Sequence, residues 1–131
     1  MTIAITALTR KTAIMRLFRQ CRADQAGSQV LLTVLMTAWT QLGLRGEDLS
    51  TGLNEMLEDG SLSLNTDPRS PAVALTASGK AWLDGVGVNP QQMLEQERIL
   101  REVQQRASQR LPDKPGQEPR WRIVDRRVQL D

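Results

Sequence analysis

Apolar side chains recur at helical spacing in four stretches of the chain, and shorter alternating stretches lie between them. The first helical stretch covers residues 10–22 and follows Thr9, whose side-chain oxygen can accept hydrogen bonds from the free N–H groups of a first turn. Cys21 continues the apolar stripe of this predicted helix. We therefore expect its thiol to be buried and unreactive.

Two more helices are predicted in the first half of the chain. Residues 29–42 are apolar around much of a helical circumference, which is typical of a central helix. Ser28 and Gly43 stand where a cap and a stop are expected for it. Residues 46–59 form the next predicted helix, with a narrower apolar face and Gly60 as its stop.

A β-hairpin is predicted directly after the third helix. Residues 61–64 alternate between polar and apolar side chains, and residues 72–75 form an apolar return strand. The intervening segment is rich in Asn, Asp, Ser and Pro, which favour a loop. Thr76 can then cap a short helix. We predict a two-stranded antiparallel hairpin over residues 61–75.

Two phrases carry a resemblance to a known family. Residues 57–62 read Leu-Glu-Asp-Gly-Ser-Leu, and residues 75–83 read Leu-Thr-Ala-Ser-Gly-Lys-Ala-Trp-Leu. Their order and spacing resemble the phrases on either side of the wing in winged helix-turn-helix regulators of the multiple-antibiotic-resistance (MarR-like) type. The resemblance implies a mainly α fold with a small β-hairpin wing (α+β) over residues 1–84, with the turn between the two central helices at 43–46.

The same resemblance implies a transcriptional regulator that binds DNA as a dimer, through the exposed face of the third helix and the wing. Asn and Arg can contact base edges, and Ser and Thr can reach phosphates. Basic residues of the first helix can add phosphate contacts. The candidate DNA-binding residues are Arg16, Arg45, Ser50, Thr51, Asn54, Asn65 and Arg69.

The charge distribution opposes simple DNA readout. The formal net charge is only +2; residues 1–30 hold five basic residues against one Asp, whereas residues 31–60 hold one Arg against five acids. Carboxylates are repelled by phosphates, so the acidic third helix favours an alternative, a winged-helix protein–protein interaction module without DNA binding. We rank DNA binding first because most modules of this architecture bind DNA, which is a fold-level analogy.

A long helix is predicted over residues 89–111, with Asn89 and Pro90 in the order favoured at a helix start. Its apolar stripe is narrow, which suits a seam against another helix. We expect a homodimer partner to supply that helix, and the alternative is that the stripe packs on the first helix. The candidate dimerisation residues are Met93, Leu100, Val103 and Ala107.

The last part of the chain, residues 112–131, reads as a Pro-rich linker followed by an Arg-rich tail. Residues 120–130 contain four Arg and one Trp among β-type residues. Such a segment can bind phosphates and stack on bases. It can equally form an edge strand or a partner-docking peptide, or remain disordered. A protein partner could therefore bind through the acidic third helix or through this tail.

Little in the sequence supports catalysis. The chain has no His, one Cys, no Tyr and no Gly-rich phosphate-binding loop. We expect no enzymatic activity, no metal and no cofactor. The longest apolar region, residues 30–39, is far shorter than the roughly 20 residues that a bilayer requires. Because the N-terminus also lacks a signal-peptide pattern, we expect a cytoplasmic protein without membrane contact.

Overall fold

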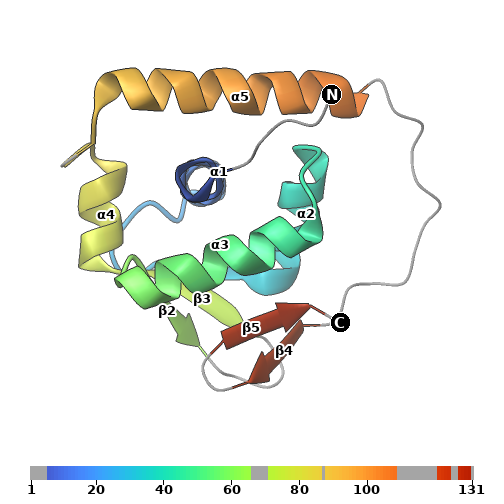
Figure 1. The fold of residues 1–131 in the computed structure, drawn as a ribbon. Helices are drawn as coiled ribbons and strands as arrows, with labels where there is room; N and C mark the ends of the chain where they lie inside the picture. The colour runs from blue at the N-terminus through green and yellow to red at the C-terminus, as the bar shows by residue number, and fades with distance from the viewer. Residues whose placement is uncertain (1–5, 66–70, 87, 109–120, 125–126, 131) are drawn as a thin grey trace.

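The computed structural model describes residues 6–65, 71–86, 88–108, 121–124 and 127–130. Within these ranges the chain is mainly helical, with a three-stranded antiparallel sheet and a separate two-stranded hairpin (Figure 1), so the predicted mainly α chain with a small β component is confirmed. Among the described helices, none combines the length and the apolarity needed to cross a lipid bilayer. The elements are α1 (Ala7–Gln20), β1 (Gln29–Leu31), α2 (Leu32–Gln41), α3 (Gly46–Asp59), β2 (Leu62–Asn65), β3 (Ala72–Leu75), α4 (Ala77–Leu83), α5 (Pro90–Ser108), β4 (Trp121–Val124) and β5 (Arg127–Leu130).

Helix α1 begins earlier than the sequence predicted, because two threonines cap it together. Thr6 is the N-cap, and its side-chain oxygen accepts a hydrogen bond from the Thr9 N–H at 3.2 Å. The Thr9 hydroxyl in turn accepts one from the Thr6 N–H at 3.4 Å. This reciprocal arrangement satisfies two N–H groups, so the helix starts after Thr6 and Thr9 lies in its first turn.

The other end of α1 corrects the expectation for Cys21. The Ala23 N–H donates to the Phe18 carbonyl oxygen at 2.8 Å, and Arg22 has a left-handed φ of 57°. This geometry is the Schellman motif, which turns the chain off the helix directly after Cys21. Cys21 is therefore an exposed capping residue, and the prediction of a buried thiol is wrong.

The stretch predicted as one helix over residues 29–42 is divided between strand β1 and helix α2. Strand β1 pairs antiparallel with β3, with Val30 opposite Val73. Ser28 does not cap a helix, since its carbonyl oxygen accepts a hydrogen bond from the Leu75 N–H at 2.9 Å. The prediction is wrong here because the pairing strand lies far along the chain, and tertiary pairing overrides local periodicity.

Helix α3, strands β2 and β3, and helix α4 lie where the sequence predicted them. Gly60 ends α3 with a φ of +86°, the left-handed conformation that glycine adopts at low cost. Strands β2 and β3 pair antiparallel, with Leu62 opposite Leu75, and the sheet order is β1-β3-β2. Thr76 caps α4 by accepting a hydrogen bond from the Gly79 N–H at 3.1 Å.

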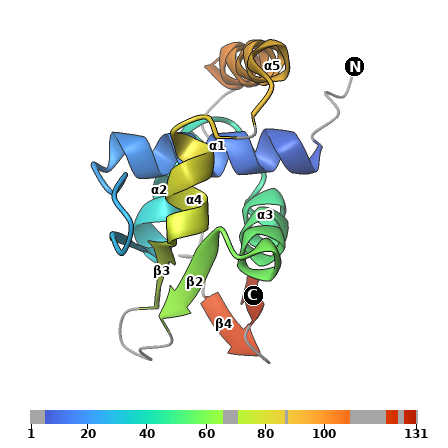
Figure 2. The same cartoon turned by 90° about the vertical axis from the view of Figure 1, so that its left-hand side faces the viewer.

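The layers of the molecule are arranged around α1. Figure 1 looks along α1, with α5 on one side of it and α3 on the other, and Figure 2 shows α1 from the side beneath α5. A single buried cluster connects these layers, and it includes Leu100 of α5 and Val128 of β5. The long helix and the tail therefore share one core with the first 84 residues. The largest fully buried side chains are Trp39, Phe18, Ile14, Met15, Leu17, Leu32, Leu35, Leu49, Leu53, Met56, Leu75 and Val73.

Helix α5 packs back on α1, which is the alternative that the sequence left open. Leu100 and Val103 are only 3% and 8% exposed. Between the two helices, the Thr9 hydroxyl donates a hydrogen bond to the buried side chain of Gln96. Leu100 and Val103 are thus core residues and offer no open seam, while the side chain of Ala107 lies outside the described part of the structure. A homodimer stays a prediction, and it would need another surface.

Candidate binding face on helix α3

Helix α3 separates its predicted site residues into covered and open positions. Ser50 and Asn54 stand one helical turn apart and both contact strand β5. Thr51 is exposed, and its hydroxyl donates to the Glu47 carbonyl oxygen at 3.0 Å. Arg45 is the exposed N-cap of the helix. The structure therefore brings Ser50 and Asn54 together, with a partner already in place.

The remaining candidate residues lie elsewhere. Asn65 is exposed at the end of β2, where its side-chain amide donates to the Gln29 side chain at 3.3 Å. Arg69 falls outside the described residues. Arg16 lines a cavity that α1 forms with α4 and α5, whereas the C-terminal hairpin lies beyond α3 (Figure 1). Arg16 is thus not brought to the candidate binding face.

Asn54 binds the backbone of Val128 through both its donor and its acceptor. Its Nδ2 donates to the Val128 carbonyl oxygen at 2.9 Å, and its Oδ1 accepts from the Val128 N–H at 2.9 Å. The Ser50 hydroxyl donates to the same carbonyl oxygen at 3.0 Å. The Asn54 amide thus offers one donor and one acceptor to a single residue, as the backbone of a neighbouring strand would.

The Val128 side chain completes this contact. It is fully buried and belongs to the core cluster, although it lies near the end of the chain. Fully burying a valine side chain is worth about 1.5–3 kcal/mol, and each of the three hydrogen bonds adds roughly 1 kcal/mol. The contact therefore combines burial of the Val128 side chain with hydrogen bonds to the backbone of the same residue.

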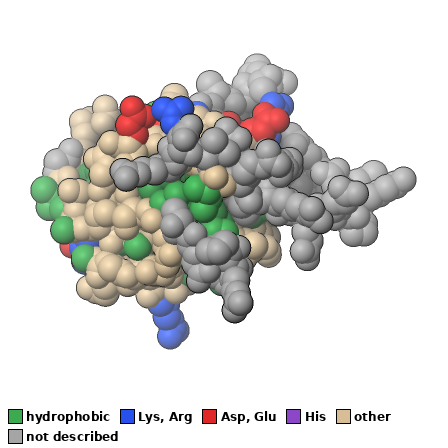
Figure 3. All heavy atoms as spheres, turned by 90° about the horizontal axis from the view of Figure 1, so that it is seen from below, with side chains coloured by type: hydrophobic (Ala, Val, Ile, Leu, Met, Phe, Trp, Pro, Cys, Tyr) green, Lys and Arg blue, Asp and Glu red, His purple; other side chains and the backbone are tan. Residues whose placement is uncertain are grey.

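Figure 3 views the molecule from below, the side on which the C-terminal hairpin lies. In the coloured part of that surface an apolar cluster occupies the middle, and Lys, Arg, Asp and Glu side chains stand mainly at the rim. Among the described residues, this face therefore shows no broad basic patch of the kind that binds a phosphate backbone.

The opposite charges of the first two segments meet between α1 and α3. Arg10 forms a bidentate ion pair with Glu55, with Nε–Oε1 and Nη2–Oε2 distances of 2.6 and 3.0 Å. The hydrogen bond to Glu55 raises the pKa of Arg10 above its ordinary value. Lys11 forms a second ion pair with Asp59 at 3.1 Å. These two basic side chains therefore neutralise acids of α3 and are not open to phosphates.

The Lys11–Asp59 contact predicts a pH dependence of stability. Burial alone would raise the pKa of Asp59, but hydrogen bonds from Ser61 and Lys11 outweigh it and hold the pKa below the ordinary value of 3.8. A depressed folded-state pKa gives stability that is present above the unfolded pKa and is lost as pH falls through the folded value. The free energy of unfolding of Asp59→Asn should therefore fall less than that of the wild type between about pH 5 and pH 2.

Urea titrations across this pH range measure the difference. Glu58→Gln is the matched control, because Glu58 is exposed on the same helix and no ion pair involving it occurs among the described residues. The free energy of unfolding of this control should change with pH in the same way as that of the wild type. Parallel curves for Asp59→Asn and the wild type would contradict the stabilising role of this carboxylate.

No metal site accompanies the face in the described ranges, where no three His, Cys, Asp or Glu side chains are grouped to hold an ion. Comparison of the chain with protein-family models, with curated proteins and with solved structures found no match. Functional assignment therefore depends on the chemistry of the site itself.

Sequence reasoning selected Ser50 and Asn54 but missed what they bind. The β-type residues of the tail predicted a strand as one alternative, and strands β4 and β5 are present at residues 121–124 and 127–130. No local signal indicated that Val128 would dock on α3, since the contact joins residues 74 positions apart. The sequence indicated a polar helix face and a candidate strand separately, and nothing in it joined the two.

Proposed function

We propose that this protein is a winged-helix protein-interaction module whose α3 face receives an extended peptide segment. The single observation that carries the proposal is the capture of the Val128 N–H and carbonyl oxygen by the Asn54 side chain, both at 2.9 Å. The C-terminal hairpin occupies the face in the isolated chain. A protein partner would present a similar strand with a β-branched side chain for the same apolar position.

Several features support the winged-helix assignment. The element order α1-β1-α2-α3-β2-β3, with β3 between β1 and β2, places a helix pair directly before a β-hairpin. Helices α2 and α3 contact each other across a short turn in which Gly43 has a φ of +84°. The two sequence phrases that resemble the MarR-like type lie at the end of α3 and at the start of α4.

Three observations favour a peptide over DNA as the occupant of α3. Ser50 and Asn54 already bind a backbone carbonyl oxygen and an N–H group. The first turn of α3 is acidic, with Glu47 and Asp48, and phosphates would be repelled there. The described basic residues Arg10 and Lys11, which could have offset these acids, are paired with α3 itself.

DNA binding by a dimeric regulator is the second candidate. Its specific support is that Arg45 and Thr51 remain exposed on α3 beside the covered positions, together with the helix–helix–hairpin order typical of such modules. On this alternative the hairpin would have to leave α3 before Asn54 could reach a base edge.

Binding of the full chain to random duplex DNA, measured over a series of salt concentrations, distinguishes the two candidates. The interaction module should show no binding even at low salt, and Arg45→Glu should change nothing. Micromolar binding that weakens steeply with salt, and a slope that Arg45→Glu lowers by about one, would instead support the regulator.

A further inference from the structure

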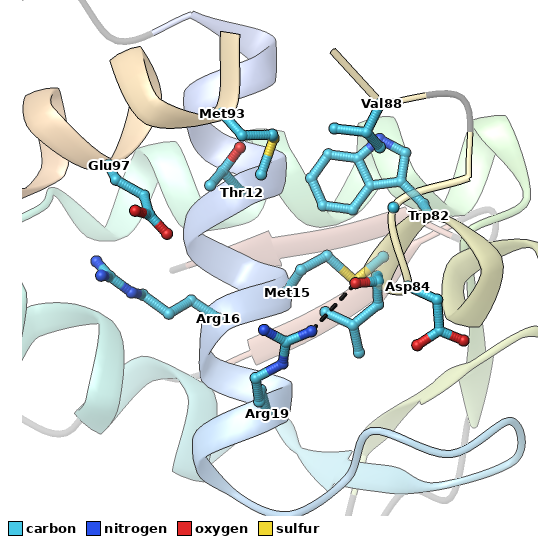
Figure 4. A pocket seen from close by; sticks show the side chains of 11 residues that line it. Thr12, Met15, Arg16, Arg19, Trp82, Asp84, Val88, Met93 and Glu97 are labelled. Carbon is cyan, nitrogen blue, oxygen red and sulfur yellow. Dashed lines mark hydrogen bonds between the residues drawn. The ribbon is translucent and has the colours of Figure 1, made fainter. Parts of the chain in front are cut away.

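A cavity of about 310 Å³ opens between α1, α4 and the start of α5, on a different side of the molecule from the hairpin contact. Figure 4 shows it from close by. Its volume is at the lower limit of small-molecule sites, which suits a ligand of metabolite size. The lining combines apolar side chains with charged groups of both signs.

The apolar part of the cavity includes two thioethers and an indole, in addition to Leu83 and Val88. Met15, which is 1% exposed, belongs to α1, Met93 to α5 and Trp82 to α4. The Lys11 ammonium lies 5.1 Å from the centroid of the Trp82 ring and helps to hold it in place. Methionine sulfur and an indole face both pack favourably against flat apolar groups. This part of the cavity therefore suits an apolar body, and an aromatic ring best.

Two of the four charged residues that line the cavity are engaged within the protein. Arg19 donates from Nη2 to the Leu83 carbonyl oxygen at 3.1 Å, and Asp84 pairs with Lys80 at 3.2 Å. The Arg19 guanidinium and the Asp84 carboxylate are therefore already occupied by contacts within the protein.

The other two, Arg16 and Glu97, are not joined. Both line the cavity, and in Figure 4 their side chains stand on the same side of it and extend toward each other. No ion pair or hydrogen bond of either side chain occurs among the described residues. Opposite charges that face one cavity without contact leave room for a ligand that carries the complementary pair.

We propose that this cavity binds a small zwitterion with an apolar body, of the class of hydrophobic α-amino acids. The ligand carboxylate pairs with Arg16, the ligand ammonium with Glu97, and the side chain lies against Met15, Met93 and Trp82. A simple anion fits less well because Glu97 would repel it, and a simple cation fits less well because Arg16 would. The site is independent of the α3 face and of the function proposed for it.

Calorimetric titration of the full-length protein at pH 6 with three probes tests the proposal. The probes are L-phenylalanine, N-acetyl-L-phenylalanine, which lacks the ammonium, and L-phenylalaninamide, which lacks the carboxylate; at this pH the free amino groups are protonated. L-phenylalanine should bind about tenfold more tightly than either analogue, because each analogue loses one charge-assisted contact.

Two variants should remove these preferences separately. Glu97→Gln should abolish the preference for L-phenylalanine over the N-acetyl analogue and keep its preference over the amide, and Arg16→Gln should do the reverse. Glu58→Gln and Arg101→Gln, which neutralise exposed residues outside the cavity, should keep both preferences. A pattern in which each variant weakens all three probes equally would overturn the assignment of the two charges.

The NMR signal of the Trp82 indole N–H reports whether L-phenylalanine binds in this cavity. This measurement uses the wild-type protein and needs no variant. The signal should shift in proportion to calorimetric saturation. Absence of binding at millimolar L-phenylalanine, or binding that leaves the Trp82 signal unchanged, would overturn the proposal. Neither result would affect the hairpin contact on α3, so the two proposals fail independently.

Discussion

Replacing Leu100 with glutamate is expected to lower the free energy of unfolding by about 4 kcal/mol or more, which is a large part of the stability of a small domain. Leu100 is 3% exposed and belongs to the same buried cluster as the side chains of α1. A glutamate there loses the apolar contacts and brings a carboxylate into the buried cluster, which is costly. Urea titration followed by circular dichroism measures the loss.

Leu94→Glu is the matched control on the same helix, because Leu94 is 67% exposed. It should change the free energy of unfolding by less than about 0.5 kcal/mol. The pair also decides the question of a dimer seam. A Leu100→Glu protein that stays folded, and whose only change is from dimer to monomer in sedimentation, would show that α5 faces a second copy and not α1.

Replacing Val128 with aspartate is expected to detach the C-terminal hairpin from α3. The side chain is fully buried, so the variant places a carboxylate against the apolar anchor position and removes most of the docking free energy. Amide protons of strands β4 and β5 should lose their protection from hydrogen exchange, whereas those of α1 and α3 keep it. We expect a loss of about 3 kcal/mol in hairpin docking.

Arg127→Gln, at the exposed neighbouring position, is the control and should leave the exchange pattern unchanged. Asn54→Ala should give an intermediate result, because it removes two hydrogen bonds and leaves the Val128 N–H without its partner but keeps the apolar contact. Unchanged protection of β4 and β5 in Val128→Asp would contradict the docking of the hairpin on α3.

The elements that the sequence predicted correctly are those with signals inside a few residues. Helix α3 has an apolar face at helical spacing and Gly60 at its end. The first strand after it alternates, the second is apolar, and a Pro-containing loop lies between them. Thr76 caps α4 as predicted. Such features depend on backbone conformation and on capping hydrogen bonds, which local composition determines.

The elements that the sequence missed depend on partners far along the chain. Residues 29–31 form a strand only because β3 lies beside them. The stripe of α5 could not reveal that α1 fills it, since a seam pattern does not name its partner. Arg22 adopts the left-handed conformation that ends α1, a position where the sequence has no glycine to predict the end of the helix. Cys21 is exposed as a result.

The candidate site also has features with local sequence signals and features that depend on distant partners. Ser50 and Asn54 were identifiable as polar residues on the open side of a helix, and their pairing with Val128 was not. The segregation of basic residues before position 30 and acids after it was visible in the sequence. Its explanation, ion pairs between α1 and α3, required the packing of those two helices.

Titration of the labelled full-length Val128→Asp variant with a synthetic peptide of residues 120–131 tests whether the α3 face receives an extended peptide segment. The variant vacates the α3 face while α1 to α5 stay folded, so the peptide should bind in place of the hairpin with a Kd below about 1 mM and shift the Asn54 side-chain amide signals. Wild-type protein, whose face is occupied, should bind it much more weakly. The double variant Asn54→Ala with Val128→Asp should bind it more weakly than Val128→Asp alone, because the two Asn54 hydrogen bonds are lost. If the folded Val128→Asp variant ignores the peptide and instead binds duplex DNA with a steep salt dependence, α3 is a DNA-reading helix that its own tail covers, and the interaction module is the wrong account.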